Sequence, residues 1–160
     1  MDVTFRKIRQ EDNKIICQII REAMSEFGGN RPGTAYYDAD TEKMFEAFQG
    51  ERAAYFVAEM NGKIVGGGGT KHLANTDKNI AELQKVYLLK KTRGLGVGKK
   101  IVELCIDFAK QNGYEAIYLE TFPNMLQAQK LYKKLGFEYI DEAIGYTGHN
   151  TNEIWMLKKF

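Results

Sequence analysis

The residues most able to do chemistry form a basic, glycine-rich turn in the middle of the chain, between a strand-like apolar segment and an apolar-striped helix. This turn contains Arg93, Gly94, Gly96, Gly98, Lys99 and Lys100. Glycine lets a backbone approach a ligand closely and adopt angles that a side chain would forbid. The N–H groups at the start of the following helix, together with the helix dipole, favour an anion. The pattern predicts a phosphate site, with a flexible turn and solvated lysines as the alternative.

The spacing within this turn narrows the choice of phosphate ligand. Lys99 and Lys100 in the first helical turn oppose the helix dipole, which a bound phosphate would explain. The glycines are spaced G-x-G-x-G, whereas a dinucleotide site needs G-x-G-x-x-G. Lys100 also stands where a mononucleotide-binding loop has Ser or Thr. Neither nucleotide-binding motif therefore fits this turn.

Two sequence blocks together resemble the GNAT family of N-acetyltransferases. Arg93-x-x-Gly96-x-Gly98, after a strand and before a helix, resembles the acetyl-coenzyme A signature of that family. The second block, residues 124–137, is similar to a later helix of the family, with Ala128, Leu131, Tyr132, Gly136 and Phe137 in register. The resemblance is strongest over residues 81–137. It implies an α/β (α+β) fold with a mixed, mostly antiparallel central sheet and flanking helices, and acetyl-coenzyme A as cofactor.

Composition agrees with a single domain that spans residues 1–160. The chain has 44% hydrophobic and 28% charged residues, an ordinary balance for a globular protein. A formal charge of +2 is too small to argue for nucleic acid. No apolar run has the length of a membrane span, and residues 1–12 lack the apolar core of a signal peptide. We therefore expect a cytoplasmic protein. The two cysteines have no metal-ligand spacing, so no metal site is expected.

The N-terminal half reads as a strand, two helices and a hairpin. We expect a strand over residues 3–8, a helix over 12–27 capped by Asp12, and a short helix from Asp40 to about residue 50. A strand over residues 53–60 leads into Asn61-Gly62, a strong hairpin signal. The return strand contains Gly66–Gly69, which predicts a bulge or a close approach of other atoms. These glycines either let the strand bend or make room for substrate.

The strand before the glycine turn, residues 80–89, carries the candidate base. Strand side chains alternate, so Glu82, Gln84, Val86 and Leu88 are expected to share one face. The resemblance implies that Glu82 is the catalytic base, because the family often has a glutamate at this place. A surface glutamate near a strand end is the alternative.

The last third of the chain reads as a strand over residues 116–122, a helix from Asn124, and a final pair of strands. The order strand, helix, strand predicts a parallel pair. Gly136 suits a left-handed helix cap, with Phe137 in the apolar contact that accompanies it. The resemblance implies that Tyr132 protonates the leaving thiolate; core packing is the alternative. Asn124 caps the helix with Gln127, or contacts the cofactor, although it stands one residue earlier than in the family.

The resemblance also implies which residues bind the cofactor. The pyrophosphate would be held mostly by backbone N–H groups of the turn, and the N–H of Leu88 would stabilise the oxyanion. The implied cofactor-binding residues are Val86, Tyr87, Leu88, Arg93, Gly94, Leu95, Gly96, Val97, Gly98, Lys99, Asn124, Ala128 and Tyr132.

The acceptor is the least determined part of the prediction. The resemblance puts the loop over residues 30–40 on the acceptor side, where Tyr36, Tyr37 and Asp38 can hold a cationic amine. The alternative is an ordinary polar loop in which Asp40 only caps the helix that follows. His149 lies in a glycine-flanked loop that either covers the site or is a solvated hairpin tip. The expected partner is a small-molecule or peptide amine. We expect no binding to nucleic acid or membrane. Whether the protein forms a homodimer is left open by the sequence.

The expected reaction is attack of an amine on a thioester, without an acyl-enzyme. Most free alkylamines are protonated at neutral pH, so a base must remove that proton, directly or through water. Two other functions stay open. One is a coenzyme A-binding module or sensor without catalysis. The other is a nucleic-acid binder that uses the basic turn, whose affinity would depend steeply on salt.

Overall fold

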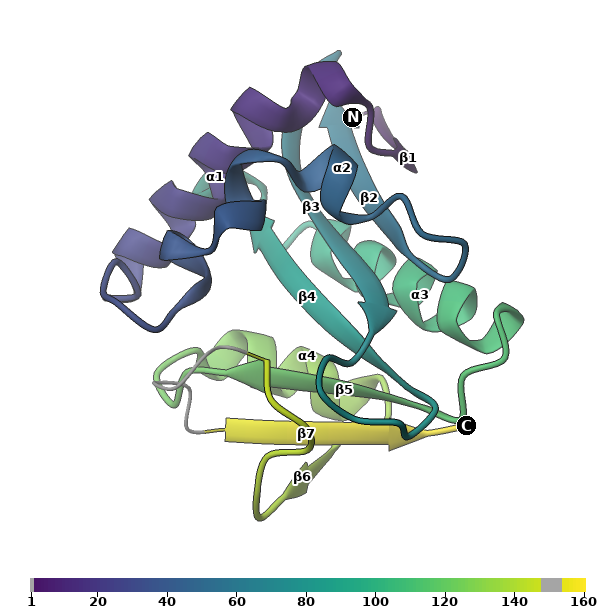
Figure 1. Ribbon diagram of the computed structural model, residues 1–160. Helices are drawn as coiled ribbons and strands as arrows, with labels where there is room; N and C mark the ends of the chain where they lie inside the picture. The colour runs from purple at the N-terminus through teal and green to yellow at the C-terminus, as the bar shows by residue number, and fades with distance from the viewer. Residues whose placement is uncertain (1, 148–153) are drawn as a thin grey trace.

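A computed structural model describes residues 2–147 and 154–160 of the 160-residue chain. Within these described residues, seven strands form one sheet in the order β1-β2-β3-β4-β5-β7-β6 (Figure 1). The strands are β1 (Val3–Lys7), β2 (Ala54–Met60), β3 (Lys63–His72), β4 (Ile80–Leu88), β5 (Ala116–Thr121), β6 (Glu138–Ile140) and β7 (Ile154–Lys159). The α-helices are α1 (Asn13–Glu26), α2 (Met44–Ala47), α3 (Val97–Gln111) and α4 (Leu126–Lys134). The predicted order of elements is therefore confirmed.

Strands β4 and β5 form the parallel pair that the sequence predicts on either side of α3. Their register joins Ile80 to Ala116 and Glu82 to Tyr118, and the pairing ends there, so the two strands diverge beyond this point. Within the described parts of the chain, all other neighbouring strands are antiparallel. The expected mixed, mostly antiparallel sheet with flanking helices is confirmed.

Helices cover both faces of the sheet (Figure 1). On one face, α3 and α4 share a core with the sheet that includes Ile101, Cys105, Tyr132 and Phe137. On the other face, α1 and α2 enclose a second core. The amphipathic stripe of α1 supplies that core with fully buried isoleucine and methionine side chains, because residues three and four apart share a helix face.

A β-bulge in β4 changes which side chains share a face. Gly67 pairs with Tyr87 and Gly69 with Gln84, so two residues of β4, Lys85 and Val86, oppose Gly68. Lys85 has a φ of 52°, and its buried carbonyl accepts a hydrogen bond of 2.8 Å from the Tyr55 hydroxyl. Such an extra residue interrupts the strict alternation of a strand.

The predicted face of β4 is therefore wrong beyond Gln84. Val86 and Leu88 pack in the core beneath α3, together with Leu83. Glu82 and Tyr87 lie on the other side, and Tyr87 packs against the core of α1. The bulge is the physical reason, because it shifts the alternation by one residue.

The glycine run of β3 serves close packing. A Cβ atom on Gly67 would lie 2.6 Å from Cε1 of Tyr55, and one on Gly68 would lie 2.7 Å from Cγ2 of Ile101. A Cβ atom on Gly66 would collide with Cδ2 of Leu88, and one on Gly69 would lie 2.5 Å from Cδ2 of Tyr55. The glycine run thus shows both features that the sequence predicts: it pairs with β4 across a bulge, and neighbouring atoms approach its backbone closely.

Three expected helix caps are wrong in detail. Asp12 accepts hydrogen bonds from Arg6 and from the Arg9 N–H instead of capping α1. Asp40 lies within a 3-10 turn, and the side chain of Asn13 caps the Phe45 N–H of the very short α2. Asn124 donates to the carbonyl of Phe27 at 3.2 Å, and α4 has no side-chain cap. In each case the expected hydrogen bond to the start of the following helix is replaced by one that involves a residue on another element of the fold.

The last two strands form the expected pair, with β7 between β5 and β6. None of the helices in residues 2–147 and 154–160 combines the length and apolarity that a membrane crossing requires. In the same residues, no group of three or more His, Cys, Asp or Glu side chains is arranged to hold a metal ion.

Candidate functional site

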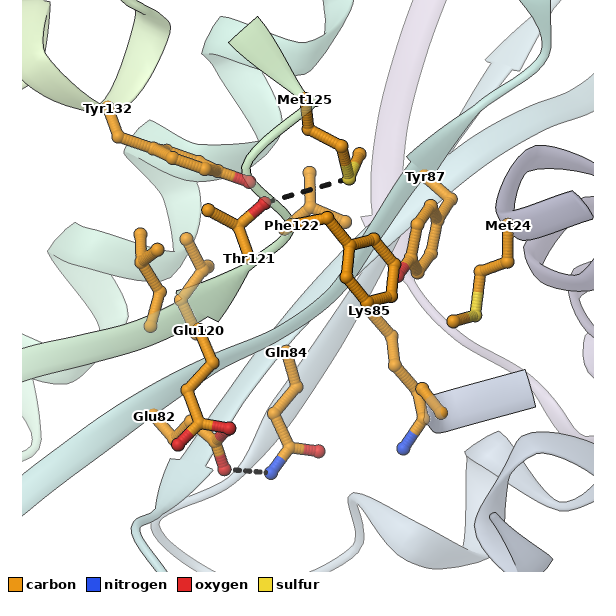
Figure 2. Close-up of a pocket in the computed structure, with 14 residues that line it drawn as sticks. Met24, Glu82, Gln84, Lys85, Tyr87, Glu120, Thr121, Phe122, Met125 and Tyr132 are labelled. Atoms are coloured by element: carbon orange, nitrogen blue, oxygen red, sulfur yellow. Dashed lines mark hydrogen bonds between the residues drawn. The ribbon is translucent and has the colours of Figure 1, made fainter. Parts of the chain in front are cut away.

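A pocket opens where β4 and β5 diverge (Figure 2). Both strands supply side chains to it, α4 and the segment before it supply others, and α1 closes one end. Its lining residues are Met24, Ala35, Glu82, Leu83, Gln84, Lys85, Val86, Tyr87, Leu119, Glu120, Thr121, Phe122, Met125 and Tyr132. The sequence-predicted residues Glu82, Val86, Tyr87 and Tyr132 are thus brought together in one pocket.

Two carboxylates, Glu82 and Glu120, lie at one end of this pocket (Figure 2). Glu82 is 3% exposed and accepts a hydrogen bond of 2.6 Å from the side-chain amide of Gln84. Glu120 accepts hydrogen bonds from the hydroxyls of Tyr118, at 2.6 Å, and Thr147, at 2.7 Å. Negative charge concentrated in this way favours a cationic or amine ligand.

The Tyr118 hydroxyl keeps its proton at neutral pH. Burial and the hydrogen bond to Glu120 raise the pKa of Tyr118 well above the usual tyrosine value. The hydroxyl therefore acts as a donor that holds Glu120, and it accepts the Ile144 N–H at 3.3 Å. This network orients one carboxylate of the pair.

Tyr132 enters the pocket from α4, near the helix end. The N–H of Phe137 donates to the Tyr132 carbonyl at 3.0 Å, the Gly136 N–H donates to the Lys133 carbonyl at 3.1 Å, and Gly136 has a φ of 99°. These contacts form the predicted left-handed helix end. Burial raises the pKa of Tyr132 above its ordinary value, so the hydroxyl is protonated at neutral pH. The side chain therefore brings a protonated hydroxyl into the pocket.

Lys85 provides a buried positive charge that the sequence does not predict. The residue is 8% exposed, and its Nζ lies 3.3 Å from Oδ2 of Asp38. Asp38 lies between two 3-10 turns of the loop that joins α1 to α2. The predicted acceptor residue Asp38 thus reaches the pocket through this ion pair.

The glycine turn leads into the N-terminus of α3. Gly94 and Gly96 have φ values of 81° and 82°, in the left-handed region that favours glycine. Gly96 is the N-cap of α3, and no side chain caps the helix. Leu95 is exposed, whereas the Val97 side chain is buried in the core, so Val97 can offer a ligand only its backbone. An uncapped helix start with exposed backbone before it fits an anion.

Arg93 fixes this turn through its side chain. Its guanidinium binds the Glu26 carboxylate near the end of α1, and its Nη2 donates to the Leu88 carbonyl at 3.0 Å. The hydrogen bond from Arg93 lowers the pKa of Glu26 below the usual value. The side chain thereby ties α1 to the end of β4 and positions the backbone from Gly94 to Gly98.

The backbone N–H of Leu88 points toward the gap between β4 and β5. Leu89 donates to the carbonyl of Val65 on β3 at 2.8 Å, which makes these two residues a hydrogen-bonded pair. Gly66 and Leu88, the next pair, are then of the type that exchanges no hydrogen bonds. The Leu88 N–H therefore faces the edge of β4 from which β5 has diverged.

Several predicted residues lie elsewhere. Tyr36 packs beneath the guanidinium of Arg21, Tyr37 is 60% exposed, and neither is among the described residues that line the pocket. Ala128 packs against the core beneath α3 and α4. Lys99, by contrast, is exposed in the first turn of α3, at the predicted phosphate site. His149 lies outside the described residues.

The sequence prediction missed Lys85 and Glu120. The sequence could have indicated which face of the strand Glu120 occupies. It stands two residues after Tyr118 on β5, and residues two apart on a strand share a face. Lys85 has no such signal, since its orientation depends on the bulge. The glycines opposite it in β3 were the only indication of irregular pairing.

Comparisons with known proteins were consistent with one another. A model of the Acetyltransferase (GNAT) family matches residues 16–137. Over 155 residues the chain is 36% identical to the uncharacterized N-acetyltransferase YjgM of Escherichia coli (strain K12), covering 96% of this chain and 93% of that protein.

Solved structures share the fold. An acetyltransferase of the GNAT family from Staphylococcus aureus superposes with a TM-score of 0.84 at 20% identity, covering 99% of both chains. The Salmonella typhimurium protein yncA, solved with its cofactor acetyl-CoA, has a TM-score of 0.79 at 21% identity, covering 99% of this chain and 94% of that one.

Proposed function

Because this chain belongs to the acetyltransferase (GNAT) family, it is an acetyl-CoA-dependent N-acetyltransferase, and we propose that it transfers the acetyl group directly to a primary amine. Glu82 serves as the base and Tyr132 as the acid. The acceptor is a small-molecule or peptide amine.

The turn before α3 and the gap between β4 and β5 fit acetyl-CoA. The uncapped start of α3, with left-handed Gly94 and Gly96 before it, suits a pyrophosphate. Val86 and Leu88 border the same gap, and their strand edge can bind an extended amide chain. When bound, acetyl-CoA supplies an activated acetyl thioester.

Glu82 is the proposed base because it lies in the pocket and is held in place. Its carboxylate accepts the Gln84 amide at 2.6 Å, and Glu120 adds negative charge at the same end of the pocket. A protonated amine would be attracted there and would lose its proton to Glu82, directly or through a water molecule. The neutral amine can then attack.

Leu88 and Tyr132 serve the other two needs of the reaction. The backbone N–H of Leu88 can donate to the carbonyl oxygen on which negative charge develops. The Tyr132 hydroxyl, which burial keeps protonated, can give its proton to the departing thiolate. The Tyr132 side chain lines the pocket, so its hydroxyl can reach a ligand bound there.

The observation that carries this proposal is the divergence of β4 and β5, which opens one pocket to both Glu82 and Tyr132 beside the start of α3. The test is release of free thiol from acetyl-CoA with a panel of primary amines, compared with the same reaction without an acceptor. Amine-dependent release with a matching N-acetylated product is expected. Release that no amine accelerates would contradict direct transfer.

A further inference from the structure

Lys85 is a buried cation that the proposed acetyl transfer does not use. Its side chain is 4% exposed and lines the same pocket as Glu82. Burying an ammonium group is costly unless it is paired, and long charged side chains are rarely buried without a partner. Its backbone also has a positive φ of 52°, which a non-glycine residue adopts uncommonly. The ion pair with Asp38 accounts for the burial of this ammonium group but places it in the pocket, where a ligand can reach it.

The bulge turns Lys85 to the same face of β4 as Glu82. Figure 2 shows Glu82, Gln84 and Lys85 extending toward the same side of the strand, with the carboxylates of Glu82 and Glu120 at one end and the Lys85 ammonium at the other. The pocket is therefore electrically divided along β4. A ligand that matches it carries a positive group and a negative group a short distance apart.

Asp38 occupies the position that the negative group of such a ligand would take. Its Oδ2 lies 3.3 Å from the Lys85 Nζ, and its side chain is 29% exposed. Asp38 stands at the junction of the 3-10 turns Ala35–Tyr37 and Ala39–Glu42, outside any helix or strand of the sheet. A partly exposed carboxylate on a loop can exchange with a ligand carboxylate, because Lys85 then keeps a negative partner.

We propose that the acceptor is an amino acid or a related amine that carries a carboxylate close to the amine, and that Lys85 binds this carboxylate. Lys85 is then a specificity-determining residue, Glu82 and Glu120 receive the ammonium group, and Asp38 holds Lys85 when no acceptor is bound. This inference rests on the proposed acetyl transfer to an amine, and it names the class of that amine.

The test compares amino acids with their carboxamides, which differ only in the negative charge. The readout is the ratio of kcat/KM for acid over amide. We expect a ratio of about ten or more for the preferred acceptor, because a charge-assisted contact to a buried group discriminates by at least that factor. In Lys85→Met, which keeps the length of the side chain, the ratio should fall toward one.

Lys71→Met is the matched control. Lys71 also pairs with an aspartate of the same loop, Asp40, at 3.4 Å, but it is not among the pocket-lining residues. This variant loses a more exposed contact to the same loop and should leave the ratio unchanged. Equal kcat/KM for acids and amides in the wild type, or an equal fall of the ratio in Lys71→Met and Lys85→Met, would overturn the proposal.

Binding provides a readout that does not depend on turnover. In the presence of coenzyme A, amino acids should raise the melting temperature more than their carboxamides, and Lys85→Met should abolish the difference. If this difference is found while no amine is acetylated, carboxylate binding by Lys85 stands and direct transfer fails. If acetyl transfer occurs without any preference for the carboxylate, direct transfer stands and the role of Lys85 fails.

Discussion

The carbonyl of Tyr132 accepts the N–H of Phe137 at 3.0 Å, and the two rings meet edge to face with centroids 5.8 Å apart. The left-handed Gly136 makes this return of the chain possible, because glycine adopts a positive φ without strain. The end of α4 therefore fixes the proposed acid twice, once through its backbone and once through its ring. Neither contact uses the hydroxyl.

Replacing Tyr132 with phenylalanine should lower the reaction rate and leave the folded structure intact. The ring contact with Phe137 remains, so the melting temperature and the affinity for acetyl-CoA should change little. We expect kcat to fall by about 10²–10⁴, the usual contribution of a general acid. Tyr139→Phe is the control, since its hydroxyl binds Gln129 outside the pocket between β4 and β5. A kcat equal to wild type in Tyr132→Phe would remove this residue from the mechanism.

Replacing Glu82 with glutamine should impair the reaction most at neutral pH. The variant lacks a carboxylate to remove the amine proton, and we expect kcat/KM to fall by about 10²-fold or more at pH 7. The deficit should narrow as the pH approaches about 10, because an alkylamine then loses its proton to solvent. The measurement is the pH profile of kcat/KM for both proteins with one amine.

Glu120→Gln is the comparison that identifies the base. Its partners Tyr118 and Thr147 hold it at the same end of the pocket, so the variant alters the local charge equally. We expect a smaller loss that varies little with pH. A deficit that narrows with pH in Glu120→Gln but not in Glu82→Gln would assign the base to Glu120.

Much of the fold follows from the sequence because local signals specify it. The Asn61-Gly62 hairpin has φ values of 54° and 78°, as its turn chemistry requires. The apolar stripes of α1 and α3 and the left-handed Gly136 were equally readable. In each case the deciding interactions lie within a few residues along the chain.

The errors occur where distant residues decide. The side chain of Asp12 binds Arg6 on β1 rather than the helix that follows it. The direction of Lys85 depends on a register shift against the glycines of β3, stabilised by Tyr55. Strict alternation along β4 could not reveal either the reversal of its faces or the buried ammonium. The divergence of β4 and β5 likewise depends on pairing that no local pattern encodes.

Alanine at Gly96 should weaken acetyl-CoA binding as well as stability. The residue has a φ of 82°, and an added Cβ would meet no atom within 4 Å, so the penalty is conformational, about 1–2 kcal/mol. Gly113, at the other end of α3, has a φ of 81° and equal free space. Gly113→Ala should therefore lower stability by a similar amount and leave the Kd for acetyl-CoA unchanged. Equal Kd changes in the two variants would contradict a phosphate site at the start of α3.

Stability should depend on pH through Asp12. Burial opposes its ionisation, but hydrogen bonds from Arg6 and from the Arg9 N–H outweigh burial and lower the pKa of Asp12. A lowered folded-state pKa gives stability above the unfolded value of about 3.9, which is lost as the pH falls through the folded-state value. Asp12→Asn should cost about 2 kcal/mol at pH 7 and progressively less at lower pH.

The measurement for Asp12 is urea unfolding of wild type and variant between neutral and acidic pH. Glu11→Gln, at an exposed neighbouring carboxylate, is the control and should track the wild type. A constant difference between wild type and Asp12→Asn at every pH would show that the Arg6–Asp12 pair does not carry the effect.

The most direct test of the central claim is the melting temperature with acetyl-CoA, beside ATP and NADH. A ligand at about 100 times its Kd stabilises the folded state by about 2.7 kcal/mol. The fit of the α3 N-terminus and of the gap between β4 and β5 predicts a clear rise with acetyl-CoA alone, reduced in Gly96→Ala and retained in Tyr132→Phe. No rise at millimolar acetyl-CoA, or an equal rise with ATP, would contradict an acetyl-CoA site built from this turn and gap.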